Sequence, residues 1–456
     1  MNSRLTKKGL TVLTSSLLVL ALAACGNNNN GKSSSSPAAT GAASPSASED
    51  TKPITLKLAT WEQPTNIEAF QKLNEKFTAK YPNITVTFDT SKPDGPYQTL
   101  LQTRLNADDA DIVTSFAINP KKDYHAGAAV PAMQQYIDAG LIEDLTGKAF
   151  LNNFTPESLK DAMTYNDKVW GIDVGMVTYT GVFYNKELFE KNNLKVPTTW
   201  PELLNVAKTL QDSGVAPFTM AGKDIWPLGM AANGFIAALE PDLEAFDKKI
   251  WSGEVKFTDP VFKEMLEKYE QMMGYMEKGF MGVDYASVVG RFAAGKAAML
   301  PDGMWNAGAI AKANPDMKFG YFPMPVSDNA ENNKNFYGKY DMSLMIAAHS
   351  KNKEAALKYL EFFSEPENYS EFVNAVGFLP TQPNVTLKDP FLQEIAPQAS
   401  KMKLAMDIIW QAPQGAGNYT SSVTPVQLLK PAGKETPEEI MNNMQKEWEK
   451  EMANLK

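Results

Sequence analysis

The spacing of apolar residues in the first part of the chain predicts alternating strands and helices. Apolar and polar side chains alternate over residues 54–60, as in a half-buried strand, and residues 84–88 and 111–114 also favour strands. Apolar residues recur at helical spacing over residues 67–81, and residues 97–105 predict a second helix. Short links between these elements imply parallel strands. We therefore predict an α/β fold.

Helix start signals recur along the chain. Asp259 before Pro260 indicates a helix with a cap and a proline in its first turn, and this helix is expected to end at Gly279. The Met and Trp residues that recur at helical spacing are expected in the core rather than at a ligand. Three segments show the capping-box spacing of Thr and Glu: Thr65–Glu68, Thr199–Glu202 and Thr436–Glu439.

A separate apolar run lies at the N-terminus. Basic residues precede the run from Leu10 to Leu22, and small residues then lead to Cys25, a pattern typical of a secretory signal over residues 1–24. The run is too short for a typical membrane span. It resembles a bacterial lipobox, which implies that Cys25 receives a lipid; the alternative is an ordinary signal peptide beside a chance cysteine. Residues 25–50 are predicted to be the lipidated cysteine and a disordered linker, reaching about 25–30 Å.

Composition narrows the function further. The formal charge is −9, and removal of Arg4, Lys7 and Lys8 with the signal makes it −12. This charge excludes a nucleic-acid binder and disfavours polyanionic ligands. Neither a metal site nor a cofactor site is indicated, because the only histidines, His125 and His349, are far apart and expected in surface or loop positions. About 400 residues remain for the folded part, enough for two lobes.

Four groups of short segments follow one another in a characteristic order. They are 77–86; 165–172 with 178–181, 184–189 and 197–200; 284–285 with 292–299 and 302–305; and 342–348 with 350–351 and 377–380. Each segment alone is too short to identify a family. Their order and spacing across residues 54–456 resemble the extracellular solute-binding proteins of ABC importers, the family that includes maltose-binding protein.

The resemblance implies a two-lobed periplasmic-binding-protein-like fold with three interlobe crossovers and a central ligand cleft. The crossovers are expected near Val177–Thr180, Tyr337–Asp341 and Leu387–Leu392. The implied N-terminal lobe is residues 51–177 plus 341–389, and the implied C-terminal lobe is residues 181–337 plus 393–456.

The resemblance also implies which residues face a sugar. Aromatic faces cover the C–H patches of a sugar ring, while carboxylates, amides and hydroxyls bind its rim. The residues at matching positions are Trp305, Tyr285, Trp226, Asp341, Glu62, Gln63, Ser115, Phe116, Tyr179 and Tyr419. Each has a structural alternative as a core or loop residue.

The function implied by the resemblance is capture of a neutral oligosaccharide for an ABC permease, by a monomer exported and lipid-anchored to the outer face of the cell membrane. A lipid-anchored glycoside hydrolase is an alternative, but the chain contains no Gly-x-Ser-x-Gly, His-Glu-x-x-His or Walker motif. The carboxylates alone prove nothing, because the chain has 53 acidic residues. A ligand sensor for a membrane kinase and an adhesin remain further alternatives.

Overall fold

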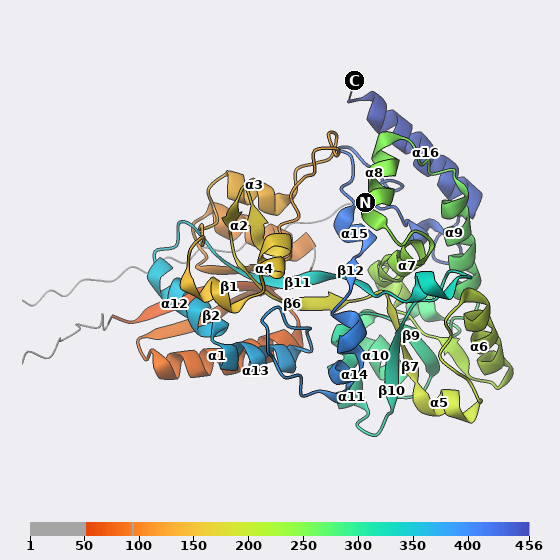
Figure 1. Cartoon of the computed structure of the whole chain (residues 1–456), viewed down its shortest axis with the longest axis horizontal. Coiled ribbons are helices and arrows are strands. Elements are labelled where there is room, and N and C mark those ends of the chain that lie inside the picture. The colour runs from red at the N-terminus through yellow and green to blue at the C-terminus, as the bar shows by residue number, and fades with distance from the viewer. Residues whose placement is uncertain (1–51, 94, 456) are drawn as a thin grey trace, which may run out of the picture. The chain divides into compact units, whose positions relative to one another are not determined.

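Two β-sheets with flanking helices organise the chain (Figure 1). The structure is a computed structural model and describes residues 52–93 and 95–455. The predicted signal peptide, Cys25 and the predicted linker lie outside the described residues. Helices and strands alternate through both sheets, which confirms the predicted α/β class.

The first sheet has six strands in the order β12-β11-β3-β1-β2, with β6 also paired to β11. These strands are β1 (Ile54–Trp61), β2 (Ile84–Ser91), β3 (Ile112–Ser115), β6 (Ile172–Thr178), β11 (Tyr337–Ile346) and β12 (Lys403–Leu404). β1 runs parallel to β2 and β3, as the strand–helix repeat predicts. β11 runs antiparallel to β3 and β6. β6 ends at the connection to the second sheet and β11 begins beside it, so the two strands run in opposite directions.

Helices α1, α2, α12 and α13 pack on this sheet, and α3 and α4 follow β3 in the chain. Their bounds are α1 (Pro64–Lys80), α2 (Gly95–Asn106), α3 (Ala132–Asp138), α4 (Pro156–Ser158), α12 (Lys353–Ser364) and α13 (Pro366–Val376). We call this sheet with α1–α3, α12 and α13 the six-stranded body. A small hairpin, β4 (Thr164–Tyr165) and β5 (Lys168–Val169), precedes β6.

The second sheet has four strands in the order β10-β7-β9-β8. These are β7 (Gly181–Asn185), β8 (Ala216–Phe218), β9 (Ala297–Pro301) and β10 (Phe319–Pro323). Its helices are α5 (Lys186–Lys191), α6 (Trp200–Asp212), α7 (Trp226–Leu239), α8 (Leu243–Ser252), α9 (Pro260–Met273), α10 (Tyr285–Ala293) and α11 (Ala307–Ala313). We call this sheet with α5–α11 the four-stranded body.

Short segments connect the two bodies. β6 ends at Thr178 and β7 begins at Gly181, so Tyr179 and Thr180 alone separate them. The C-terminal part of the chain then contributes α14 (Pro390–Ala399), α15 (Met406–Ile409) and α16 (Pro437–Ala453). In this part β12 pairs with the start of β11, α15 contacts α8, and α16 packs on α9. The C-terminal segment therefore joins the first sheet briefly and then the helices of the four-stranded body.

The predicted helix signals meet different outcomes. Thr436 and Glu439 form the predicted capping box of α16, with each side chain bonded to the other's backbone N–H. The prediction of a capping box at Thr65–Glu68 was wrong. Helix α1 begins at Pro64, and Gln63 at its cap makes no side-chain hydrogen bond. A proline is tolerated in the first turn, where its missing N–H costs no helical bond, so the helix starts earlier than a Thr65 cap requires.

Two further helix predictions need correction. Thr199 does precede α6, but Glu202 accepts bonds from the backbone and hydroxyl of Thr198, and Thr199 makes no side-chain cap. Helix α9 ends at Met273 instead of near Gly279. The chain leaves the helix there because Glu277 N–H donates to the carbonyl of Phe218 at 2.8 Å, which extends the edge beside β8.

The Met and Trp stripes lie in the core, as predicted. Met265, Met272, Met444 and Trp448 are all buried against neighbouring helices. In the part of the chain that the structure describes, no helix combines the length and apolar character needed to cross a bilayer.

Candidate functional site

Four side chains at the end of β9 form a closed hydrogen-bond group that we call the Tyr285 cluster: Tyr285, Asp302, Trp305 and Asn306. The Tyr285 hydroxyl accepts bonds from Trp305 Nε1 at 2.6 Å and Asn306 Nδ2 at 2.9 Å. It donates to Asp302 Oδ1 at 3.1 Å, and Asn306 donates to Asp302 Oδ2 at 2.9 Å. Trp305 remains partly exposed while its indole N–H is fixed. The cluster therefore holds one aromatic face in a set orientation.

Burial sets the protonation of this cluster. Removal of Asp302 from water raises its pKa to about 7, although hydrogen bonds from Gly303 N–H, Tyr285 and Asn306 oppose the rise. Burial and the neighbouring Asp302 also raise the pKa of Tyr285 well above its usual value. The Asp302 carboxyl is thus neutral in mildly acidic solution and becomes ionised as the pH rises through about 7.

Trp226 extends the aromatic surface beyond the cluster. Its side chain is 41% exposed, and its ring centroid lies 4.5 Å from that of Tyr285. Ile225 immediately before it has φ +64°, a strained conformation for a β-branched residue. Asp224 accepts the Tyr285 backbone N–H at 2.5 Å and so joins this turn to the start of α10. The strained turn thereby holds a large aromatic ring in solvent beside Tyr285.

The connection between the two sheets carries a second polar contact. Tyr179 is buried, its ring lies 6.1 Å from that of Trp305, and its hydroxyl donates to Asp407 Oδ1 at 2.6 Å. Asp407 belongs to α15 and is exposed to solvent, yet surrounding protein raises the pKa of its carboxyl. Sequence reasoning missed Asp407, although it is an isolated charge among the apolar residues 404–410.

The start of β11 supplies an ion pair. Lys339 Nζ lies 2.7 Å from Asp341 Oδ1 and 3.9 Å from the ring centroid of Phe116, and both charged side chains are largely buried. Phe116 in turn lies 5.0 Å from Trp61, ring centroid to ring centroid. The charge of Lys339 also acts on the carboxyl of Asp407 and partly opposes the rise of its pKa. These contacts continue the aromatic and polar surface into the six-stranded body.

A third carboxyl lies behind this ion pair. Asp173 on β6 is fully buried, and neither of its carboxylate oxygens has a hydrogen-bond partner in the structure. Burial first and the charge of Asp341 second raise its pKa well above the usual value, and the N–H of Gly175 only partly opposes this. We call Asp173, Lys339 and Asp341 the Asp341 group. No sequence pattern points to Asp173, because a lone acidic residue in a strand usually faces solvent.

The structure therefore brings six of the predicted residues into one row and leaves four outside it. The row contains Trp226, Tyr285, Trp305, Tyr179, Asp341 and Phe116, joined through Lys339 and Asp407. Tyr285 differs from a simple stacking residue, because its hydroxyl is used inside the cluster. Sequence reasoning favoured a structural role for Tyr179, whose ring is indeed buried.

The other four predicted residues have different surroundings. Ser115 is buried, and its carbonyl accepts the Ser343 hydroxyl at 3.1 Å. Glu62 is exposed after β1, and Gln63 occupies the cap of α1. Tyr419 donates its hydroxyl to Glu435 at 2.8 Å, close to α16, and no contact joins it to the row. Trp61, rather than Glu62 or Gln63, links β1 to the row.

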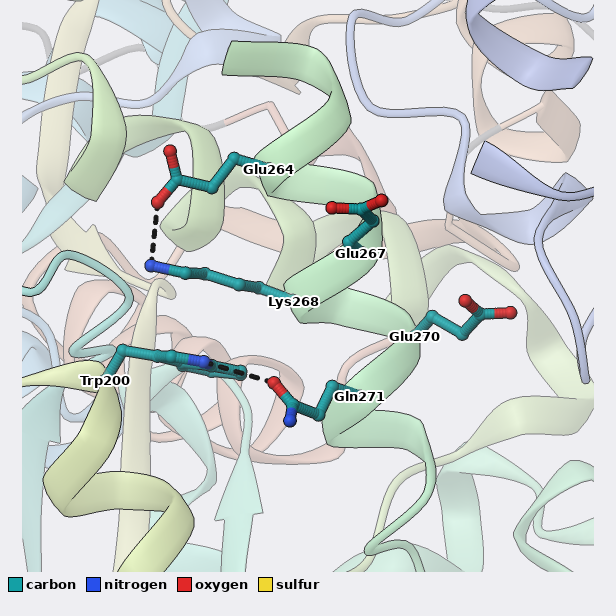
Figure 2. A pocket seen from close by; sticks show the side chains of 6 residues that line it. All are labelled: Trp200, Glu264, Glu267, Lys268, Glu270 and Gln271. Atoms are coloured by element: carbon teal, nitrogen blue, oxygen red, sulfur yellow. Dashed lines mark hydrogen bonds and ion pairs between the residues drawn. The ribbon is translucent and has the colours of Figure 1, made fainter. Parts of the chain in front are cut away.

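Two hollows in the described surface lie away from this row. One, of about 420 Å³, is lined by Trp200 and by residues of α9. Figure 2 shows Trp200 bonded to Gln271 at 3.3 Å and Lys268 directed to Glu264 at 2.8 Å. Three glutamates and one lysine line this hollow, so acidic side chains outnumber basic ones there. The second, of about 460 Å³, lies between Leu379 and α14.

The described residues contain no group of three or more His, Cys, Asp and Glu side chains placed to hold a metal ion. His125 lies in a loop, one of the two positions expected from sequence, but it is completely buried there and bonded to Gln411 and Asp247. The candidate site is therefore an aromatic and carboxyl row between the two sheets, with one lysine in its middle.

An α/β protein with two sheets joined by short connections, and with an aromatic and polar row between them, has the design of a two-lobed binding protein. Residues 72–399 match the family described as bacterial extracellular solute-binding protein, and the chain belongs to that family. This membership confirms the predicted resemblance and places the chain among exported proteins.

Relatives and solved structures agree with this family. A multiple sugar-binding protein of Streptococcus mutans is 25% identical over 343 residues, covering 74% of this chain and 77% of that protein. A maltotriose-binding protein of Pyrococcus abyssi is 25% identical, covering 85% of this chain and 83% of its own. The structure of the solute-binding protein RafE in complex with raffinose is similar in fold, with a TM-score of 0.73, 21% identity, and coverage of 87% and 99%. A sugar transporter of Bacillus licheniformis in complex with stachyose has a TM-score of 0.67 at 19% identity, with coverage of 87% and 100%.

Proposed function

We propose that this protein captures a neutral oligosaccharide between its two bodies and delivers it to an ABC permease without chemical turnover. The observation that carries the proposal is the row of aromatic rings flanked by carboxyls, from Trp226 through Trp305 to Asp341. Rings of this kind cover the apolar faces of sugars, while carboxyls accept bonds from hydroxyls. The relatives that bind maltotriose, and the structures with raffinose and stachyose, support the same ligand class.

The charge of the row favours a neutral sugar over an acidic one. Lys339 is already paired with Asp341, and its positive charge also interacts with the carboxyl of Asp407. A ligand carboxylate or phosphate would meet at least as many acidic groups as basic ones. Neutral hydroxyls, in contrast, can bond to these carboxyls without charge repulsion.

Isothermal titration calorimetry tests the proposal directly. The mature protein is titrated with raffinose, stachyose, maltotriose and an acidic oligosaccharide of similar length as the charge control. We expect saturable binding to at least one neutral sugar and none to the acidic sugar. Chromatography of the recovered sugar should show it unchanged; cleavage at catalytic rates would assign the protein to the glycoside hydrolases instead.

We also propose that the six-stranded body without β12, and the four-stranded body with the C-terminal segment, are the two predicted lobes, 51–177 plus 341–389 and 181–337 plus 393–456. Ligand would draw them together by rotation at the connections near Thr178, Gly338 and Lys388. Small-angle scattering with the sugar found by calorimetry should show a smaller radius of gyration on binding. An unchanged scattering profile at saturation would contradict lobe closure.

The proposed membrane tether is a lipid on Cys25. A lipid anchor and a linker would hold the folded part close to a permease in the same membrane. Membrane fractionation of cells that produce the Cys25→Ser variant should find the protein released or unprocessed. A processed variant that stays with the membrane would contradict the anchor.

A further inference from the structure

A fully buried polar cluster surrounds His125, outside the candidate site. His125 Nε2 lies 2.7 Å from Asp247 Oδ2, and Nδ1 lies 2.9 Å from Gln411 Oε1. The Tyr124 hydroxyl donates to the same Asp247 oxygen at 2.7 Å. His125 and Asp247 are both completely buried, and the ring of Trp251 lies 5.0 Å from the imidazole. A buried pair of this kind is costly to assemble unless it is well satisfied, so its position needs an explanation.

Hydrogen bonds hold both sides of the His125 ring. Gln411 Nε2 donates to the backbone carbonyls of Asn119 and Pro120, at 3.2 and 3.1 Å, so its Oε1 faces His125 Nδ1. Asp247 Oδ2 faces Nε2 on the other side of the ring, while Asp247 Oδ1 has no hydrogen-bond partner among the described residues. The cluster is therefore a buried hydrogen-bonded group that links His125 to α8 and to the segment after α15.

His125 lies in a segment that crosses from one body to the other. We call residues 117–130 the strap. The strap starts directly after Phe116 at the end of β3, and Ile118 N–H donates to the carbonyl of Ala162 at 2.9 Å near the six-stranded sheet. Beyond its far end, Gln134 of α3 donates to the Tyr165 hydroxyl at 3.0 Å. Both ends of the strap thus belong to the six-stranded body.

The middle of the strap is held by other parts of the chain. Asp247 is on α8, which packs on α9 through Phe246 and Phe262, with ring centroids 5.7 Å apart. Gln414 N–H donates to the carbonyl of Gly127 at 2.7 Å, and Ala128 forms a β-bridge with Pro413. The strap therefore binds α8 and the segment that follows α15.

The two segments joined by the strap both carry residues of the candidate row. Phe116 directly precedes the strap, and Asn119 within it bonds to the carbonyl of Ile408, next to Asp407. Any movement that separated Phe116 from Asp407 would have to pull this contact apart or carry the strap with it. The strap is also separate from the connection through Tyr179, so it restrains the two bodies at a second place.

We propose that the strap, latched by the His125–Asp247 pair, positions the Phe116 and Asp407 sides of the row and limits how far the two bodies separate. This proposal rests on the proposed function only for its benefit to ligand capture. The restraint itself is a property of the ligand-free protein. His125 and Asp247 are thus positioning residues that do not touch a ligand.

Distance measurement without sugar tests the restraint. Spin labels carried by unnatural residues replace the exposed Lys72 on α1 and Lys263 on α9 in the full chain, and pulsed electron resonance measures their separation. We expect His125→Gln and Asp247→Asn to broaden the distance distribution towards longer values. The matched control is Tyr359→Phe, which removes a buried 2.6 Å bond to Asn74 inside the six-stranded body and should leave the distribution unchanged.

The outcomes separate a latch from ordinary packing. Should either latch variant melt earlier but keep the distribution of the control, the cluster only stabilises the fold and the proposal is overturned. If His125→Gln does not fold, Tyr124→Phe is the milder variant: a smaller shift in the same direction supports the latch, and an unchanged distribution overturns it. Because no sugar is present, failure to bind any oligosaccharide would affect the proposed function and not this result.

Nitrogen NMR of the imidazole rings provides an independent readout. The chain has only two histidines, so His349→Gln assigns the His125 signals without ambiguity. The two His125 nitrogens should show the shifts of a ring that is hydrogen-bonded at both positions, and Asp247→Asn should change the Nε2 signal. His125 shifts that stay the same in Asp247→Asn would overturn the latch.

Discussion

The Tyr285 cluster and the Asp341 group lie in the same row but are built in opposite ways. In the cluster, every hydroxyl, amide and indole group is bonded to a neighbour, and burial raises the pKa of its one carboxyl to about 7. In the Asp341 group, a lysine and a carboxylate share one contact, and the Gly175 N–H offsets only part of the cost of burying Asp173.

This difference indicates that the two groups have different roles in the proposed sugar site. A self-satisfied cluster fixes the Trp305 ring before ligand arrives, which lowers the entropy lost on binding. In the Asp341 group, Lys339 contacts only Oδ1 of Asp341, so we expect Asp341 Oδ2 to accept hydroxyls from a ligand. We therefore expect the cluster to supply apolar contact and the Asp341 group to supply polar selectivity, and four predictions test this contrast.

The largest effect is expected from removal of the fixed aromatic face. Trp305→Ala should weaken sugar binding by about 1–3 kcal/mol, the scale for a well-packed aromatic anchor. Calorimetry measures the affinity, and thermal unfolding without sugar serves as the control. A variant that unfolds, or whose melting temperature falls as much as its affinity, would assign Trp305 to the core.

Asp341→Ala should have the next largest effect on binding. The change removes a charged acceptor and leaves Lys339 without its 2.7 Å partner, and we expect a loss of about 1 kcal/mol in affinity. Lys339→Met with Asp341→Ala is the matched double variant, because it removes the stranded charge. If the double variant recovers full affinity, Asp341 acts only as a partner for Lys339 and not on the ligand.

Tyr285→Phe tests whether the cluster works by positioning. The ring and its contact with Trp226 remain, but Trp305 and Asn306 lose their common acceptor. We expect a loss of roughly 0.5–1 kcal/mol in affinity together with a more mobile Trp305. Fluorescence anisotropy of tryptophan follows that mobility against the Tyr184→Phe control, whose hydroxyl is outside the cluster. Unchanged affinity would show that the ring alone suffices.

The last prediction concerns pH and folding stability rather than sugar affinity, where we expect the smallest effect from this carboxyl. The folded-state pKa of Asp302 is raised from 3.8 to about 7, so its contribution to stability is complete below about pH 3.8 and is lost as pH rises through 7. Asp302→Asn removes this titration while keeping the bonds from Gly303 and Tyr285 sterically possible. Compared with the variant, the wild type should lose unfolding free energy between pH 4 and 7. Parallel curves for the two proteins would show that Asp302 does not titrate there.

Parts of the fold could be predicted because they depend on local sequence. Three features each follow from residues within a few positions of one another. They are the strands β1–β3, the capping box at Thr436 and the buried Met residues at helical spacing. Predictions failed where a distant segment competed. Helix α9 was predicted to continue to Gly279, but residues 276–277 pair with the end of β8 instead. The sequence near Gly279 contains no pattern that predicts this pairing with a distant strand.

The aromatic members of the row could be found from the sequence, whereas its charged members could not. Trp305, Tyr285 and Trp226 stand out as large rings after strand or loop signals, and their family positions suggested a ligand. Asp407 and Asp173 gave no comparable signal, because one acidic residue looks like another until its neighbours are known. Tyr419 is an aromatic residue that was predicted to bind sugar, yet its hydroxyl donates to Glu435 near α16.

The sequence by itself determined the α/β class, the family and the local helix and strand pattern, because these depend on side-chain spacing and on short-range hydrogen bonds. Only the tertiary structure decided that Asp407 meets Tyr179, that Lys339 pairs with Asp341, and that His125 is buried against Asp247. Such pairs join residues far apart in the chain. Their energies depend on burial and on the orientation of donors and acceptors, and both exist only once the chain has folded.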